Sequence, residues 1–269
     1  MKCIVLAAGY ATRLYPITKN FPKPLLLVGE KTVLDWLVDD IAASDAVDEF
    51  VIISNHRFFK YFDIWAKAKE QEWKAAAAPS VCSEPEGAVL PCGSAVASKK
   101  ITVVDDGTLH NDTRLGAVKD IIFAVNARKI DDDCLIIAGD NLLDFSFRSF
   151  IDYAISRNAS CVMRYYEPEF PKISKSGCLV IDENEKVLEM QEKPPVPKSH
   201  WCCPPFYYYK RADIARISEA IADGCGTDAP GSYVAWLCKR AAVYAFEMPG
   251  KRYDIGDVES YNRVNEEFL

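Results

Sequence analysis

The chain has 269 residues, of which 49% are hydrophobic and 26% charged, with a formal net charge of -7 at pH 7. A chain of this length can bury a substantial core, either as one large α/β domain or as two closely packed lobes. The acidic balance argues against a nucleic-acid-binding surface, but a nucleotide substrate needs only a local basic pocket.

Cysteine usage and the first residues indicate a cytoplasmic protein with reduced thiols. The ten cysteines include no Cys-x-x-Cys pair, and the three histidines do not add the short spacings of a zinc site. The first apolar run is short and is followed by polar residues, unlike a secretory signal. No stretch approaches the roughly twenty apolar residues that cross a membrane, so we expect no membrane contact.

The opening stretch predicts a phosphate site. Cys3–Ala8 is an apolar run of the length of a buried strand, and it breaks at Gly9 into a polar loop. A glycine turn after a strand lets backbone N–H groups point at an anion. In this loop Arg13 offers a planar fork for phosphate oxygens. The triplet Pro22-Lys23-Pro24 restrains the backbone around a second cation.

The next elements alternate between helix and strand. Residues 33–43 have apolar positions at helical spacing with Thr32 as N-cap, and 58–73 predict an amphipathic helix. Between and after them, 50–53 and 101–104 predict buried strands. Residues 75–100 are Ala-rich and then Pro-rich without a sustained period, which indicates a surface insertion.

This alternation predicts a mainly parallel, doubly wound sheet. A helix opened by the segment Asn111–Ala117 and running to about Ala127 precedes a strand at Cys134–Ala138. Such sheets bind ligands outside the carboxyl ends of their strands, and both Gly9 and Asp140 lie at such ends. A carboxylate at this point can hold Mg²⁺ or can simply belong to a turn.

The second half is less regular and predicts a mixed lobe. We expect a nucleotide-binding lobe over residues 1–145 and an acceptor-binding lobe with a closing helix over 146–269. The expected elements are helix 147–157, strand 160–165, a hairpin of 177–181 and 187–191, strand 206–209, helices 212–222 and 232–239, strand 242–246 and helix 258–268.

The opening stretch resembles the signature of the sugar-phosphate nucleotidylyltransferases, Gly-x-Gly-Thr-Arg…Pro-x-Thr…Pro-Lys-Pro. Ala11 replaces the usual second glycine, and we expect a slightly altered loop. The resemblance implies a Rossmann-like fold of the nucleotide-diphospho-sugar transferase type. The matching positions are Gly9, Thr12, Arg13, Leu14, Pro16, Thr18, Pro22, Lys23 and Pro24. The implied nucleotide-binding residues are Leu6, Ala7, Ala8, Gly9, Thr12, Arg13, Lys23, Gly116 and Asp140.

The resemblance extends to later motifs. The Gly139-Asp140 pair and the segment Tyr253–Asp257 match the family's two metal-binding motifs, which implies Mg²⁺ on Asp140 and Asp254. Asp257 is better interpreted as the N-cap of the last helix. The Glu192-Lys193-Pro194 motif, with Gly177 heading the preceding hairpin strand, implies an acceptor site. Arg114, beside Gly116, is either a phosphate or base contact or a solvated side chain.

These motifs predict an Mg²⁺-dependent enzyme that joins a nucleoside triphosphate to a sugar 1-phosphate and releases pyrophosphate, with Arg13 and Lys23 as catalytic residues. Two alternatives stay open: a cytidylyltransferase acting on phosphocholine or another alcohol phosphate, and a non-catalytic nucleotide-binding homologue. A dehydrogenase is disfavoured because the glycine triad is missing. The sequence leaves the nucleobase, the acceptor and the oligomeric state undetermined.

Overall fold

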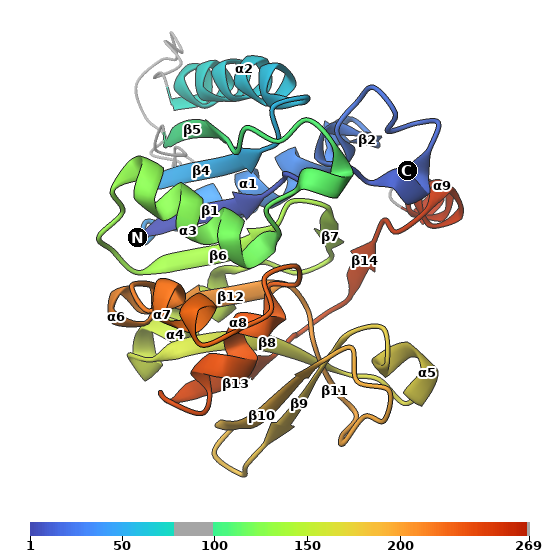
Figure 1. Cartoon of the computed structure of the whole chain (residues 1–269). Helices are drawn as coiled ribbons and strands as arrows, with labels where there is room; N and C mark the ends of the chain where they lie inside the picture. Colours follow the sequence, from blue (N-terminus) through green and yellow to red (C-terminus); the bar gives the residue numbers. More distant parts are fainter. Residues whose placement is uncertain (78–98, 268–269) are drawn as a thin grey trace, which may run out of the picture.

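One large sheet runs through the protein in a computed structural model that describes residues 1–77 and 99–267. Its strand order within these residues is β10-β9-β11-β8-β12-β6-β1-β4-β5, with β13 paired to β8 (Figure 1). Most of the predicted 75–100 insertion lies outside the described residues. The strands of this sheet are β1 Lys2–Leu6, β4 Glu49–Ser54, β5 Lys100–Asp105, β6 Cys134–Ala138, β8 Ser160–Tyr166, β9 Gly177–Ile181, β10 Val187–Glu192, β11 Trp201–Cys203, β12 Phe206–Tyr209 and β13 Val243–Glu247.

The first half supplies the parallel part of the sheet, as predicted. Strand β1 lies between β4 and β6, with Ile4 opposite Val51 on one side and Ile136 on the other. Strand β5 continues the parallel order beyond β4. All three named residues are buried, because both faces of these strands are covered by helices.

Two helical layers cover the sheet. Buried side chains of α1, α2 and α4 pack with one face, and those of α3, α6, α7 and α8 pack with the other. Within the described residues, no helix is long and apolar enough to cross a membrane. The helices are α1 Val33–Ala42, α2 Phe59–Ala77, α3 Ala117–Arg128, α4 Arg148–Arg157, α5 Phe170–Ile173, α6 Arg211–Ile214, α7 Ile217–Ala222, α8 Gly231–Leu237 and α9 Val258–Glu267.

The second half adds antiparallel strands to the same sheet. Strand β12 pairs antiparallel with both β6 and β8, so the sheet continues without a break between the two predicted lobes. Strands β9 and β10 form the predicted hairpin, whose register places Glu192 opposite Gly177. The result is a mainly parallel first half with a mixed second half, which confirms the predicted fold class.

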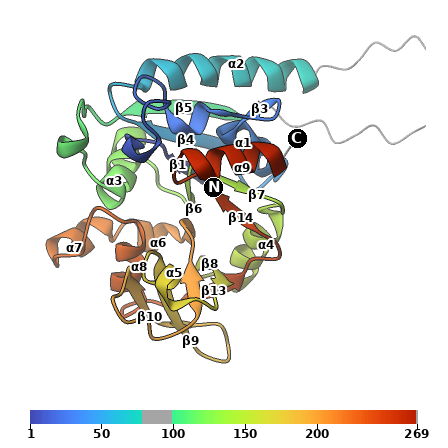
Figure 2. The same ribbon diagram turned by 90° about the vertical axis from the view of Figure 1, so that its right-hand side faces the viewer.

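The end of the described chain returns to the first half. Strand β14 (Arg252–Asp254) pairs antiparallel with β7 (Asn141–Leu143), which follows the end of β6. Helix α9 then packs Val264 against the opening loop and α1, and the Tyr261 hydroxyl donates to the Leu27 carbonyl at 2.7 Å (Figure 2). The protein therefore joins residues 250–267 to residues 1–35.

Local sequence signals correctly predicted where two helices begin. The Thr32 side chain caps α1 in a reciprocal capping box with Asp35. Asp257 Oδ1 accepts from the Ser260 backbone N–H at 2.8 Å, which confirms it as the cap of α9.

Other predicted boundaries were wrong. The predicted helix 212–222 is two short helices, α6 and α7, interrupted at Ala215 and Arg216. The segment from Asn111 does not open α3 directly. It forms a single 3-10 turn at Asn111–Thr113, and the helix begins at Ala117 because Gly116 adopts φ +91°. The short pairs β2 (Leu27–Val28) with β3 (Lys31–Thr32), and β7 with β14, were not predicted.

Candidate active site

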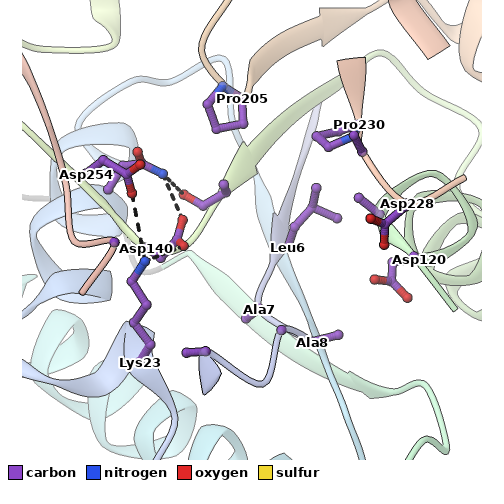
Figure 3. A pocket seen from close by; sticks show the side chains of 18 of the residues that line it. Leu6, Ala7, Ala8, Lys23, Asp120, Asp140, Pro205, Asp228, Pro230 and Asp254 are labelled. Atoms are coloured by element: carbon purple, nitrogen blue, oxygen red, sulfur yellow. Dashed lines mark hydrogen bonds and ion pairs between the residues drawn. The ribbon is translucent and has the colours of Figure 1, made fainter. Parts of the chain in front are cut away.

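A pocket of about 650 Å³ lies at the carboxyl ends of the parallel strands and extends to the β9–β10 hairpin. It brings together every residue that the sequence proposed for the site, from both halves of the chain. Figure 3 shows Lys23, Asp140 and Asp254 among them. Its lining includes Leu6, Ala7, Ala8, Gly9, Thr12, Arg13, Lys23, Gly116, Asp140, Gly177, Glu192, Lys193 and Asp254.

The loop after β1 is held in shape by its own backbone and by Thr18. Ala11 adopts the left-handed conformation (φ 47°, ψ 43°), a conformation that suits the glycine of the signature described above. The buried Thr18 hydroxyl donates to the Ala11 carbonyl at 2.8 Å, and the Leu14 N–H donates to the same carbonyl at 3.0 Å. The loop thus leaves Arg13 exposed at the pocket, with no salt bridge or hydrogen bond to another described residue.

Lys23 lies at the centre of a charged network. It begins a 3-10 turn, is only 6% exposed, and points its ammonium into the pocket (Figure 3). Its Nζ lies 2.6 Å from Asp140 Oδ2 and 3.9 Å from Asp254 Oδ1. The two carboxylates therefore converge on one cation, although they are 114 positions apart in the sequence.

The pairing of β7 with β14 explains this convergence. The antiparallel register puts Asn141 directly opposite Asp254. The buried Asn141 side chain donates to Asp140 Oδ1 at 2.9 Å and accepts from Arg252 at 2.6 Å. We call Lys23, Asp140, Asn141, Arg252 and Asp254 the Lys23 network.

Charge neighbours keep Asp140 ionised. Its withdrawal into the pocket opposes ionisation, but the Lys23 ammonium and then the Arg252 guanidinium outweigh this and lower the pKa of the Asp140 carboxyl. Asp140 is thus an anion at neutral pH, in contact with a cation that a phosphate could compete for.

Asp140 and Asp254 fit an Mg²⁺ site that substrate completes. Their side chains are 38% and 52% exposed, so their oxygens are accessible from the pocket. No group of three or more His, Cys, Asp or Glu side chains within the described residues could hold a metal ion by itself. Two carboxylates are nevertheless what Mg²⁺ commonly takes from a protein when phosphate oxygens and water supply the other ligands.

The opposite side of the pocket is formed by the β9–β10 hairpin and the turn before it. We call Lys175, Gly177, Glu192 and Lys193 the hairpin wall. Lys175 and Lys193 are exposed and form no salt bridge with another described residue. Burial raises the pKa of the Glu192 carboxyl, against the opposing charge of Lys193. Its Oε2 lies so near Gly231 that a Cβ there would come within 2.2 Å.

Gly116 joins the two halves of the chain beside the pocket. A Cβ at this position would lie 2.6 Å from the Thr227 carbonyl oxygen, so only glycine fits. The first N–H groups of α3, from Ala117 and Val118, donate to the carbonyls of Asp228 and Thr227. The sequence left Arg114 open as a phosphate or base contact or as a solvated side chain. Its guanidinium donates to Asp228 Oδ1 at 2.9 and 3.0 Å, while its side chain stays 42% exposed at the pocket.

Some lining residues were missed from the sequence. Arg252 and Asn141 flank proposed ligands, and their roles depend on the β7–β14 pairing, which no local pattern announces. Lys175 lies in a turn without a motif. Asp120, in the first turn of α3, belongs to no motif that the sequence analysis identified, yet it is 7% exposed and lines the pocket.

The fold is that of an α/β protein whose pocket, at the carboxyl ends of its parallel strands, is lined by cationic side chains and two converging carboxylates. The chain matches the nucleotidyl transferase family over residues 2–269 and belongs to that family.

Curated relatives and a solved structure agree with this assignment. A bifunctional protein GlmU of Methanocaldococcus jannaschii is 23% identical over 95% of this chain and 51% of its own length. A glucose-1-phosphate adenylyltransferase of Fervidobacterium nodosum is 21% identical over 99% of this chain and 60% of its own length. The chain thus spans about half to three fifths of these relatives. A UDP-glucose pyrophosphorylase complexed with UDP-glucose shares the fold, with a TM-score of 0.76 and 20% identity over 99% of this chain and 97% of its own.

Proposed function

We propose that the protein transfers a nucleotidyl group from a nucleoside triphosphate to a sugar 1-phosphate, giving a nucleotide sugar and pyrophosphate. The observation that carries the proposal is the convergence of Lys23, Asp140 and Asp254 in one pocket with three cations that have no salt-bridge partner among the described residues. These three cations are Arg13, Lys175 and Lys193. In a chain of net charge -7, such a local excess of unpaired cations indicates a polyanionic ligand.

The reaction is an in-line displacement at the α-phosphorus. An oxygen of the acceptor phosphate forms the new bond to phosphorus, and the bond to the bridging oxygen breaks, so that pyrophosphate leaves with the electron pair. Such a transfer needs positioning and charge neutralisation more than a protein nucleophile. Arg13 is suited to hold the leaving β- and γ-phosphates, because its guanidinium is accessible and can donate two parallel hydrogen bonds to phosphate oxygens.

Lys23 is suited to act on the α-phosphate. It is largely withdrawn from water, where a fixed charge stabilises developing negative charge more strongly than in solution. Its contact with Asp140 holds the ammonium in position before the substrate binds. Asn141 and Arg252 act through Asp140, so we regard them as positioning residues.

Asp140 and Asp254 would hold Mg²⁺, which when bound would neutralise phosphate charge. The ionised Asp140 carboxylate and the accessible oxygens of both side chains meet the requirement for ligands of a hard cation. Without the ion, their protein partners are Lys23 and Arg252.

The hairpin wall is suited to bind the acceptor. Lys193 offers a charge to the incoming phosphate, and Glu192 offers carboxylate oxygens to a hydroxyl of a sugar. Gly177 and Gly231 leave space for the Glu192 and Met190 side chains, since a Cβ at either glycine would lie within 2.6 Å of the Met190 methyl group. The glucose-1-phosphate adenylyltransferase named above acts on a sugar phosphate, which favours a sugar over an alcohol phosphate such as phosphocholine.

A substrate matrix tests the proposal. Each of five nucleoside triphosphates is paired with glucose 1-phosphate, mannose 1-phosphate, N-acetylglucosamine 1-phosphate and phosphocholine, and pyrophosphate release is followed with Mg²⁺ and again after chelation. We expect release with at least one sugar 1-phosphate, and its loss on chelation. Nucleotide binding without pyrophosphate release from any pair would favour a non-catalytic homologue and overturn the proposal.

A further inference from the structure

Asp120 is a buried acid that the fold does not use. It is 7% exposed, and its Oδ1 has no hydrogen-bond partner among the described residues. It does not cap α3, because the helix begins at Ala117 and backbone carbonyls bind its first N–H groups. Burying a carboxyl oxygen without a partner is unfavourable, so such a group in a pocket lining calls for a ligand.

The position of Asp120 separates it from the phosphate-binding side. Figure 3 shows Asp120 on the side of the pocket away from Lys23, Asp140 and Asp254, with Leu6, Ala7 and Ala8 between them. Gly116, one helical turn earlier, also lines the pocket. A ligand whose phosphates lie at Lys23 would thus extend over small apolar residues and end at Asp120.

The surroundings of Asp120 favour its neutral form. Burial raises the pKa of its carboxyl to about 7, and the nearby acid Asp106 adds to the shift. Helix α3 packs against β1, β4 and α7 through apolar side chains such as Ile4, Ile53 and Ile217. The cation Arg114, which lines the same pocket, is bound to Asp228 and to a backbone carbonyl.

We propose that Asp120, as a neutral carboxylic acid, hydrogen-bonds an edge of the nucleobase that presents a donor beside an acceptor. The proposal rests on the proposed function, since it assigns a residue to the nucleotide of that reaction. The hydroxyl of the acid donates to the ring or carbonyl acceptor of the base, and the carbonyl oxygen accepts from the neighbouring N–H. Adenine, cytosine, uracil and thymine each have such an edge, and guanine has one at O6 and N1–H. Guanine alone adds two adjacent donors, N1–H and N2–H, which suit an ionised carboxylate.

A phosphate at Asp120 is disfavoured. The carboxyl has no cation beside it to offset a second anion, and a nearby triphosphate would raise its proton affinity further. A base edge, by contrast, satisfies Oδ1 without adding charge.

The test measures binding of ATP, CTP, UTP, dTTP and GTP by calorimetry at pH 6 and pH 8, with the wild-type protein, D120N, D120A and the exposed-acid control D112N. The amide of D120N keeps one donor and one acceptor but does not titrate. We expect D120A to lose at least tenfold in affinity for the preferred nucleotide, and D120N at pH 6 to stay within about threefold of wild type. From pH 6 to pH 8 the affinity ratio of wild type to D120N should fall about tenfold. Taking this ratio cancels titration of the triphosphate itself, and D112N should behave as wild type.

The outcomes separate the two proposals. Unchanged nucleotide affinity in D120A, with pyrophosphate release intact, would overturn the role of Asp120 and leave the proposed function standing. A preference for GTP that strengthens as pH rises would overturn the neutral-acid pairing. Failure of the wild-type protein to bind any of the five nucleotides would instead refute the proposed function itself.

Discussion

The Lys23 network and the hairpin wall face the same pocket but are built differently. Each charged member of the Lys23 network has a hydrogen bond or salt bridge to another member. In the hairpin wall, Lys175 and Lys193 form no salt bridge with a described residue, and Glu192 is held by packing near Gly231. One side is thus ordered by the protein itself, whereas the other leaves its charges for a ligand to pair.

This difference teaches where the protein places its rigid contacts. Fixed charges stabilise a transition state best when they need no rearrangement, which suits residues acting on the α-phosphate. Unpaired surface cations give affinity for an anion at low structural cost, which suits the acceptor. We therefore expect substitutions in the network to reduce turnover, and those in the hairpin wall to reduce acceptor binding.

The largest effect is expected where the network loses its centre. Lys23→Ala should lower the turnover number about 100- to 1,000-fold in a pyrophosphate-release assay, because it removes a buried charge beside the proposed position of the α-phosphate. Lys19→Ala, at an exposed lysine of the same loop that does not line the pocket, should change turnover less than twofold. Wild-type turnover in Lys23→Ala would refute the role of the network.

The second-largest effect is expected at Gly116, and it is a loss of stability. Gly116→Ala places a methyl against the Thr227 carbonyl and forces alanine to φ +91°, so we expect about 2–4 kcal/mol less stability in urea unfolding. Gly224→Ala is the matched control, because its φ is +83° but no atom lies within 4 Å of the added Cβ. It should cost only about 1–2 kcal/mol. Equal losses would show that backbone strain alone accounts for the effect.

In the hairpin wall, we expect a substitution to weaken acceptor binding rather than to lower turnover. Lys193→Ala should raise the KM for the sugar phosphate about tenfold or more, while the KM for the nucleotide stays within twofold. Lys198→Ala removes a lysine that pairs with Glu189 outside the pocket, and should leave both values unchanged. A fall in turnover alone would place Lys193 with the Lys23 network instead.

The smallest effect is expected at Gly231. The atoms nearest to a methyl there are the ends of two flexible side chains, Glu192 and Met190, so Gly231→Ala should keep the fold and displace the Glu192 carboxylate. We expect a severalfold rise in the acceptor KM with less than about 1 kcal/mol lost in unfolding. A large stability loss would mean that these side chains cannot move.

The sequence predicts the fold well where the signals are local. We identified β1, β4 and β6 from their apolar runs and the start of α1 from the Thr32 cap. These signals are readable because strand length, burial and capping depend on residues that are adjacent in the sequence. The three-residue strands β7 and β14 escape prediction because their stability comes from pairing across 111 positions. The interruption at Ala215–Arg216 carries no glycine or proline that would announce it.

The site follows the same division. Motif residues such as Lys23, Asp140 and Glu192 were found from short patterns and all line the pocket. Arg252 and Asp120 were not found, because the first depends on a distant strand and the second on burial. A charged residue in a helix is usually solvated, and only packing reveals the exception.

The pairing of β7 with β14 makes the pocket depend on a late segment. A chain cut before residue 250 would retain the parallel strands and the opening loop, yet it would lack Arg252, Asp254 and the α9 contact with Leu27. During synthesis, Asp140 and Asp254 can therefore come together only after residue 254 has left the ribosome. Until then, the nascent chain presents only Asp140 of this pair.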